Sequence, residues 1–110
     1  MIKLKDGVNI EDLCPEMERA RDAIDAILEP MGYDTVITSG NDGKHKPDSF
    51  HYSGRALDFR TKHIEKSQRP LVVLSVKLVL RKGYDVLWEN KGQDNEHLHV
   101  EFDPKESDVK

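Results

Sequence analysis

The decapeptide SFHYSGRALD, residues 49–58, and the tetrapeptide EHLH, residues 96–99, decide how this sequence is interpreted. The decapeptide carries an imidazole, His51, seven positions before a carboxylate, Asp58, and the tetrapeptide ends on a second imidazole, His99. Two histidine nitrogens and one aspartate oxygen form a three-ligand set for one zinc ion and leave a fourth position open for water. The glutamate that opens the tetrapeptide can then accept a proton from that water. Together these residue types indicate a metal-assisted hydrolase.

The two stretches also contain characteristic sequence motifs, Ser-x-His-x-x-Gly-x-Ala-x-Asp and Glu-x-x-His. This pattern resembles the zinc D-alanyl-D-alanine peptidases of peptidoglycan, which are grouped with the Hedgehog signalling fold. The residues at the fixed positions of the pattern are Ser49, His51, Gly54, Ala56 and Asp58, followed by Glu96 and His99. The resemblance implies a peptidase with one Zn²⁺ ion, and peptidoglycan stem peptides or other D-amino-acid peptides as its substrates.

Size and composition restrict the remaining possibilities. A chain of 110 residues predicts a single domain, 1–110, with one modest core. The formal net charge of −4 offers no basic field that would favour nucleic acid. No apolar run is long enough to span a bilayer, so we expect no membrane partner, and we expect a monomer. The single cysteine, Cys14, excludes an intramolecular disulfide. Because the first residues lack the apolar core of a signal peptide, we expect synthesis in the cytoplasm without a leader.

The hydrophobic periodicity predicts an α+β fold. Two amphipathic helices are expected, over residues 15–31 and 68–82, although the valine and leucine content of the second would also suit a buried strand. Short β-branched or alternating runs predict strands at 35–38, 55–59, 84–89 and 97–102, the last two joined as a hairpin. Residues 1–12 are expected to form an irregular arm and 104–110 a frayed tail. The architecture that follows is a small antiparallel sheet with the helices packed on one face, as in the Hedgehog/DD-peptidase fold.

Alternation in the last predicted strand places His97 and His99 on the face opposite the core. Residues three apart in a regular strand face opposite ways, so Glu96 reaches the metal only if it lies in the preceding turn. We therefore predict Glu96 as the catalytic base. His97, on the same face as His99, is the alternative as proton shuttle or as stabiliser of the oxyanion. Gly54, which lies between His51 and Asp58 in the sequence, is expected to supply either a positive φ or a close backbone approach.

Candidates for substrate binding come from the loop before the first ligand and from the last strand. Members of the resembled family often carry an arginine shortly after the Thr-Ser-Gly strand end, where it binds substrate, and no arginine follows here. Lys44, His45 and Lys46 are the candidate replacements, and a solvated charged loop is the alternative. Ser49 is expected either to bind substrate or to steady the His51 loop, and His97 is a further substrate candidate.

The residues themselves predict metal-assisted hydrolysis of a polar bond, and the resemblance implies a zinc-dependent peptidase of peptidoglycan stem peptides. The bond cut is left open between D,D- or L,D-carboxypeptidase cleavage and endopeptidase cleavage at L-alanyl-D-glutamate. A compact catalytic core without a wall-binding module or export signal suggests a bacteriophage enzyme of lysis or wall penetration, which acts on the cell wall after release. A non-catalytic zinc-binding module of the same fold is the alternative, and a structural protein with incidental histidines is a third interpretation.

Overall fold

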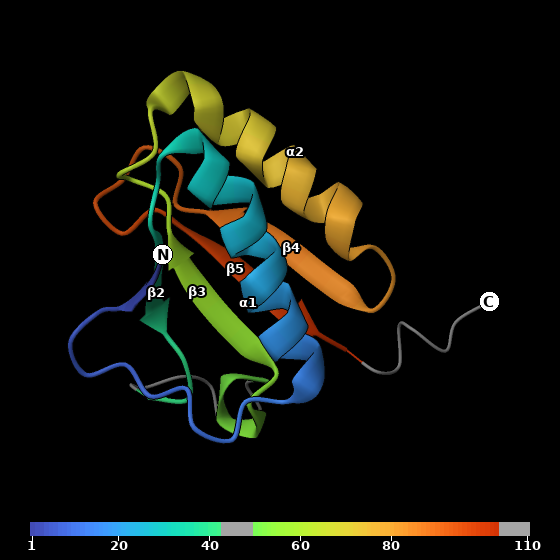
Figure 1. The fold of residues 1–110 in the computed structure, drawn as a ribbon. Coiled ribbons are helices and arrows are strands. Elements are labelled where there is room, and N and C mark those ends of the chain that lie inside the picture. The colour runs from blue at the N-terminus through green and yellow to red at the C-terminus, as the bar shows by residue number, and fades with distance from the viewer. Residues whose placement is uncertain (43–49, 104–110) are drawn as a thin grey trace.

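The computed structural model describes residues 1–42 and 50–103. They form a five-stranded sheet with two helices lying across one of its faces, so the fold is α+β with its helices on one side, as predicted (Figure 1). The core lies between the two layers. Neither helix among these residues is both long and apolar enough to cross a membrane.

The first helix, α1, covers Pro15–Leu28 and is continued by a 3-10 turn, η1, over Glu29–Met31. Its buried side chains recur at helical spacing and are Met17, Ala20, Ile24 and Leu28. Pro30 interrupts the α-helical hydrogen bonds because it has no N–H, and Gly32 ends the segment with a φ of 88°. The helix predicted over 15–31 is thus confirmed, with its last turn tightened.

The second helix, α2, covers Arg69–Leu80 and follows a short 3-10 turn, η3, at Lys66–Gln68. Val72, Val73 and Val76 are buried at helical spacing against α1 and the sheet. The choice of helix over strand for this apolar run is therefore confirmed.

The strands are β1 (Ile2–Leu4), β2 (Thr35–Ser39), β3 (Ala56–Arg60), β4 (Tyr84–Glu89) and β5 (His97–Phe102). They lie side by side in the order β1-β2-β3-β5-β4. The hairpin of β4 and β5 pairs Tyr84 with Phe102 and Glu89 with His97, without a bulge. The four strands predicted from sequence are all present, and the predicted hairpin is confirmed.

The arm expected at residues 1–12 differs from the structure at its start. Ile2–Leu4 is a strand that pairs in parallel with β2, so the sheet is mixed rather than wholly antiparallel. Three residues are too few to show an alternating pattern, and this strand forms because tertiary contacts hold it. The Thr35 N–H donates to the Met1 carbonyl over 2.9 Å, and the terminal amine lies 3.2 Å from Asp25 on α1. The tail predicted to fray, 104–110, lies outside the described residues.

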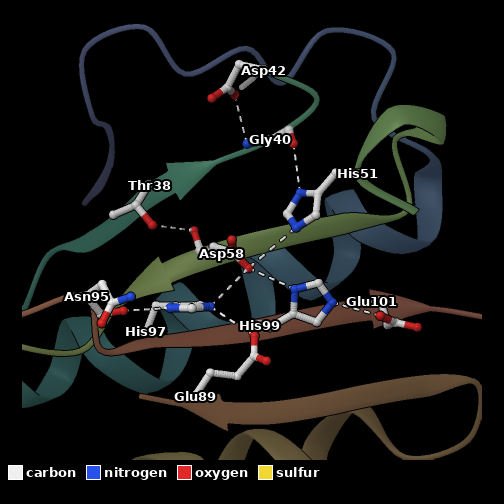
Figure 2. Close-up of polar contacts among 10 residues, drawn as sticks. All are labelled: Thr38, Gly40, Asp42, His51, Asp58, Glu89, Asn95, His97, His99 and Glu101. Carbon is white, nitrogen blue, oxygen red and sulfur yellow. Dashed lines mark hydrogen bonds and ion pairs between the residues drawn. The ribbon is translucent and has the colours of Figure 1, made fainter. Parts of the chain in front are cut away.

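Side chains on the central strands alternate between the two faces of the sheet. Leu57 and Phe59 of β3 and Leu98 and Val100 of β5 are buried under the helices. The residues between them in sequence point to the helix-free face, and there Asp58 is paired with His99 across β3 and β5. The prediction that the histidines of β5 face away from the core is confirmed. The helix-free face is where the charged and imidazole groups gather (Figure 2).

Candidate metal centre

Three elements bring His51, Asp58 and His99 together on the helix-free face. His51 lies in a 3-10 turn, η2 (Phe50–Ser53), Asp58 in the middle of β3, and His99 in β5. One ligand atom from each residue lies within 4.8 Å of the other two, a group that could hold a metal ion. Nε2 of His51 is 3.5 Å from Oδ1 of Asp58, and Nδ1 of His99 is 2.8 Å from the same oxygen. Figure 2 shows the two rings converging on the Asp58 carboxylate. The predicted ligand cluster is thus assembled by the fold.

The His51 ring is buried and held in one orientation by the backbone. Its Nδ1 donates to the Gly40 carbonyl over 2.7 Å, which leaves Nε2 directed at Asp58 (Figure 2). A hydrogen bond from the other ring nitrogen to a carbonyl is the usual way in which proteins fix the tautomer of a metal-binding histidine. Gly40 itself is held by the carboxylate of Asp42, which accepts from the Gly40 and Asn9 amides over 2.9 and 2.8 Å.

Two glycines let the N-terminal segment approach the metal loop closely. A Cβ on Gly40 would lie 2.1 Å from the Asn9 carbonyl oxygen, and one on Gly54 would lie 2.2 Å from that of Asp12. Gly54 also has a φ of +71°, which side-chain-bearing residues rarely adopt. Both of the roles proposed for Gly54 from the sequence therefore apply. The segment before α1 thus supports the loop that carries His51.

The His99 ring lies between two carboxylates. Nδ1 donates to Asp58, and Nε2 donates to Oε1 of Glu101 over 2.7 Å. Burial lowers the pKa of His99, but the hydrogen bonds to these carboxylates outweigh it and raise the pKa to about 9. Burial also raises the pKa of Asp58, and the hydrogen bonds from His51 and His99 outweigh that effect and hold it well below its usual range.

These orientations fit a divalent cation. With Nδ1 of His51 and Nε2 of His99 both engaged elsewhere, one nitrogen of each ring remains directed at the Asp58 carboxylate. The carboxylate of Glu101 behind His99 is a common outer partner of a metal-binding histidine. Two imidazole nitrogens and one carboxylate oxygen are a donor set that suits zinc. Oxygen-seeking ions such as Mg²⁺ and Ca²⁺ prefer ligand sets made of oxygen alone.

A second pair of ionisable groups adjoins the cluster. Nε2 of His97 lies 3.0 Å from Oε1 of Glu89 and 3.8 Å from Oδ1 of Asp58 (Figure 2). Nδ1 of His97 donates to the Asn95 carbonyl over 2.8 Å, so Nε2 is the nitrogen that faces Glu89. Glu89 and Glu101 were not among the candidates from the sequence. The hairpin register could have identified Glu89 from the sequence, since strands of equal length place it opposite His97. Alternation in β5 could have identified Glu101, since it places Glu101 on the same face as His99.

Glu96, predicted as the catalytic base, is engaged in a different set of contacts. Its side chain is only 1% exposed. One oxygen accepts from Arg69 over 3.2 Å and from the Gly92 amide over 2.9 Å. The other accepts from Thr61 over 2.5 Å and from Trp88 over 3.1 Å.

Four donors occupy the lone-pair positions of the Glu96 carboxylate. Burial raises its pKa, but the hydrogen bonds from Thr61, Gly92 and Trp88 and the charge of Arg69 outweigh it, and the pKa lies below its usual value. A base needs a free lone pair beside the reacting water, and Glu96 has none among these contacts. The assignment of Glu96 as the base therefore does not fit its surroundings, whereas its predicted place in the turn before β5 is correct.

Of the predicted substrate-binding residues, Lys44, His45, Lys46 and Ser49 lie outside the described residues. His97 is described and lies beside the ligand cluster, as given above. It also lines a cavity of about 580 Å³ that extends from Asp58 along the edge of the site. The cavity is bordered by Lys5, by β2 and β3, by residues 62–63 and by the turn before β5. A volume of this size is within the range of small-molecule and peptide pockets.

Comparison with known protein families identifies a family whose sequence model this chain matches. Residues 33–101 match the sequence model of a family described as the Hedgehog amino-terminal signalling domain. The matched segment begins just before β2 and ends in β5, so it contains all three residues of the ligand cluster and more than half of the chain. The part of the chain that matches the family model is therefore also the part that builds the candidate metal centre.

Proposed function

The chain belongs to the Hedgehog amino-terminal signalling domain family, and on that premise we propose that it is a zinc-dependent peptidase of the Hedgehog/DD-peptidase fold. The observation that supports this proposal most directly is the cluster of His51, Asp58 and His99 on the helix-free face of the sheet. Closed structural zinc sites use four protein ligands, whereas catalytic sites use three and leave one position for water or substrate. The described residues offer three, next to a cavity that a peptide can enter.

In this proposal His51 and His99 hold the ion through the ring nitrogens that face Asp58, and Gly40 and Glu101 fix their orientations. When bound, zinc acts as a Lewis acid on a peptide carbonyl and lowers the pKa of water. The protein supplies the positions of these groups and the route for the proton.

We assign proton transfer to the pair of Glu89 and His97 rather than to Glu96. Glu89 is 45% exposed at its side chain, so its carboxylate is accessible to water and to a substrate. Nε2 of His97 lies between that carboxylate and Asp58, so it can pass a proton between Glu89 and the reacting atoms. The pair would accept a proton from the attacking water and return it to the leaving amine. This keeps the alternative role that the sequence left open for His97.

The proposed substrate class is the stem peptide of peptidoglycan. Its support is the Ser-x-His-x-x-Gly-x-Ala-x-Asp pattern of residues 49–58, which resembles zinc D-alanyl-D-alanine peptidases. The activities that this proposal includes are D,D- or L,D-carboxypeptidase and L-alanyl-D-glutamate endopeptidase cleavage. A role in lysis or wall penetration, as for a bacteriophage enzyme, is part of the same proposal.

The test combines metal analysis with a digest of defined muropeptides followed by mass spectrometry. We expect one zinc per chain, and loss of that zinc in Asp58→Asn. Glu89→Gln should keep the zinc and reduce turnover by roughly 10²–10⁴-fold, since that is the usual contribution of a general acid–base group. Asp22→Asn, an exposed carboxylate on α1, is the matched control and should keep both properties. Full zinc loading without cleavage of any muropeptide would instead favour a non-catalytic zinc-binding module.

A further inference from the structure

We propose that the cavity beside Asp58 is a carboxylate-binding subsite in which Arg60 and Lys5 are the cations. The binding of an anion there follows from the charges and geometry of the cavity. The identification of that anion as a carboxylate of the peptide substrate rests on the proposed function.

The position of Arg60 follows from the strand geometry. It lies two residues after Asp58 in β3, so both side chains point to the helix-free face, and its cross-strand partner is His97. Lys5 comes from the other side of the cavity, immediately after β1, where its amide donates to the Ile37 carbonyl over 2.9 Å. Both residues belong to the cavity lining together with Thr38 and Asp58. Two cations from separate parts of the sheet thus border one space next to the ligand cluster.

Each acid in the lining already has a counter-charge or a full set of donors. Asp58 is held by the two ligand histidines, and Glu96 by Arg69 and its other donors. Asp94 lies 3.7 Å from Lys62 at the cavity rim. Arg60 and Lys5, by contrast, make no ion pair with any residue of 1–42 or 50–103. Within the described residues, Arg60 and Lys5 are therefore the cations of the lining whose charge no ion pair balances.

The chemistry of these two cations selects the anion. A guanidinium presents a planar fork that matches a carboxylate with two parallel hydrogen bonds, and an ammonium adds a second point charge. A cavity of about 580 Å³ accommodates such a group together with part of a peptide.

The distance along β3 limits where that carboxylate lies in the substrate. The Cα atoms of residues two apart in a strand are separated by roughly 7 Å, and an extended peptide spans roughly 3.5 Å per residue. A substrate carboxylate held by Arg60 therefore lies within about two substrate residues of a scissile bond placed at the His51, Asp58 and His99 cluster. Peptides with a free carboxylate close to the scissile bond are the class that this subsite would favour. Those with an amide at the same position would bind more weakly.

The experiment compares N-acetyl-D-alanine with its amide as ligands of the zinc-loaded protein, by calorimetry and by NMR titration. Neither probe contains a second D-residue to be cleaved, so binding is measured without turnover. We expect the acid to bind about tenfold or more tightly than the amide, which is the effect of one charged hydrogen-bonded contact. Arg60→Gln combined with Lys5→Gln should abolish this preference, and Arg60→Lys should restore part of it. Arg19→Gln, on an exposed side of α1, is the matched control.

The zinc content of each variant shows whether the ligand cluster is intact. A double variant that keeps its zinc and the full preference for the acid would overturn the proposal, because the carboxylate would then be binding elsewhere. Equal binding of acid and amide by the unaltered protein would also overturn it, even if muropeptides are cleaved and the proposed function stands. An Arg60-dependent preference without any muropeptide cleavage would support the subsite and count against the peptidase proposal.

Discussion

Replacing Glu96 with glutamine should destabilise the protein rather than remove its catalytic base. Each carboxylate oxygen accepts two hydrogen bonds, and the glutamine amide would place an NH₂ group against two of the four donors. The change also leaves the guanidinium of Arg69, 13% exposed at its side chain, without its counter-charge. Breaking a buried ion pair by removing one partner costs about 3–5 kcal/mol, and a hydrogen bond to a charged group contributes about 1.5–3 kcal/mol. Because glutamine keeps part of the network, we expect a loss of about 2–5 kcal/mol.

A loss of this size is readily measured. For a chain of 110 residues, the usual entropy of unfolding converts it to a fall in Tm of about 10–20 °C. Urea unfolding of Glu96→Gln at pH 7 should give the same loss in free energy. At temperatures where the variant is folded, its zinc content and turnover should remain close to those of the unaltered protein.

The matched control is Glu89→Gln, which removes an exposed carboxylate from the other side of the hairpin. Its stability should change by less than about 0.5 kcal/mol, as for most surface substitutions, while turnover falls. The reasoning is refuted if Glu96→Gln has the stability of the unaltered protein and is inactive with its zinc bound. That result would return the role of base to Glu96.

The same interaction has a pH dependence of known sign. The folded-state pKa of Glu96 is lowered by its donors, so its contribution to stability is present above the pKa of about 4.3 of an exposed glutamate. The contribution is lost as the pH falls through the lower folded-state pKa. The difference in stability between the unaltered protein and Glu96→Gln should therefore narrow in acid. A difference that is constant from pH 7 into the acid range would contradict this account.

Three further predictions concern the ligand cluster. In metal-free protein the raised pKa of His99, about 9, contributes stability that is present below a pH of roughly 6.5 and is lost as the pH rises through 9. In the presence of chelator, the Tm of the unaltered protein should therefore fall over this pH range, and the Tm of His99→Gln should not. Glu101→Gln should weaken zinc binding by about 10–100-fold, because it removes the outer partner of His99; equal affinity in a competition titration would count against that role. Gly54→Ala should destabilise the His51 loop and lower zinc affinity, since a Cβ would lie 2.2 Å from the Asp12 oxygen. The control is Gly92→Ala, because Gly92 has a φ of +79° and a Cβ there would meet nothing within 4 Å. This control measures the cost of a positive φ without the clash.

The strands and their faces were predictable because their signal is local. Alternation of apolar and polar residues in 97–102 identifies which side of β5 meets the helices, and the structure places His97 and His99 on the other side. The same reasoning placed the turn between 90 and 95 and the hairpin around it. A three-residue strand such as Ile2–Leu4 has no such signal, since its pairing with β2 depends on contacts with residues more than thirty positions away.

The choice of base shows the limit of reasoning from neighbours in sequence. Glu96 precedes His99 by three residues and matches the spelling of the resembled family, yet its carboxylate is surrounded by Thr61, Arg69, Trp88 and the Gly92 amide. Glu89 is ten residues from His99 and enters the site because antiparallel pairing sets it opposite His97.

The sequence by itself predicted the fold class and singled out the three residues that the fold gathers into a group able to hold a metal ion, because residue type, spacing and alternation along single strands carry that information. Only the tertiary structure decided which carboxylates remain free to react, and which cations border the cavity beside Asp58. The physical reason is that a side chain's lone pairs and charges are satisfied by whatever packs against it. The partners of Glu96, such as Arg69, come from distant parts of the chain. Arg60 lines the cavity and makes no ion pair with another described residue.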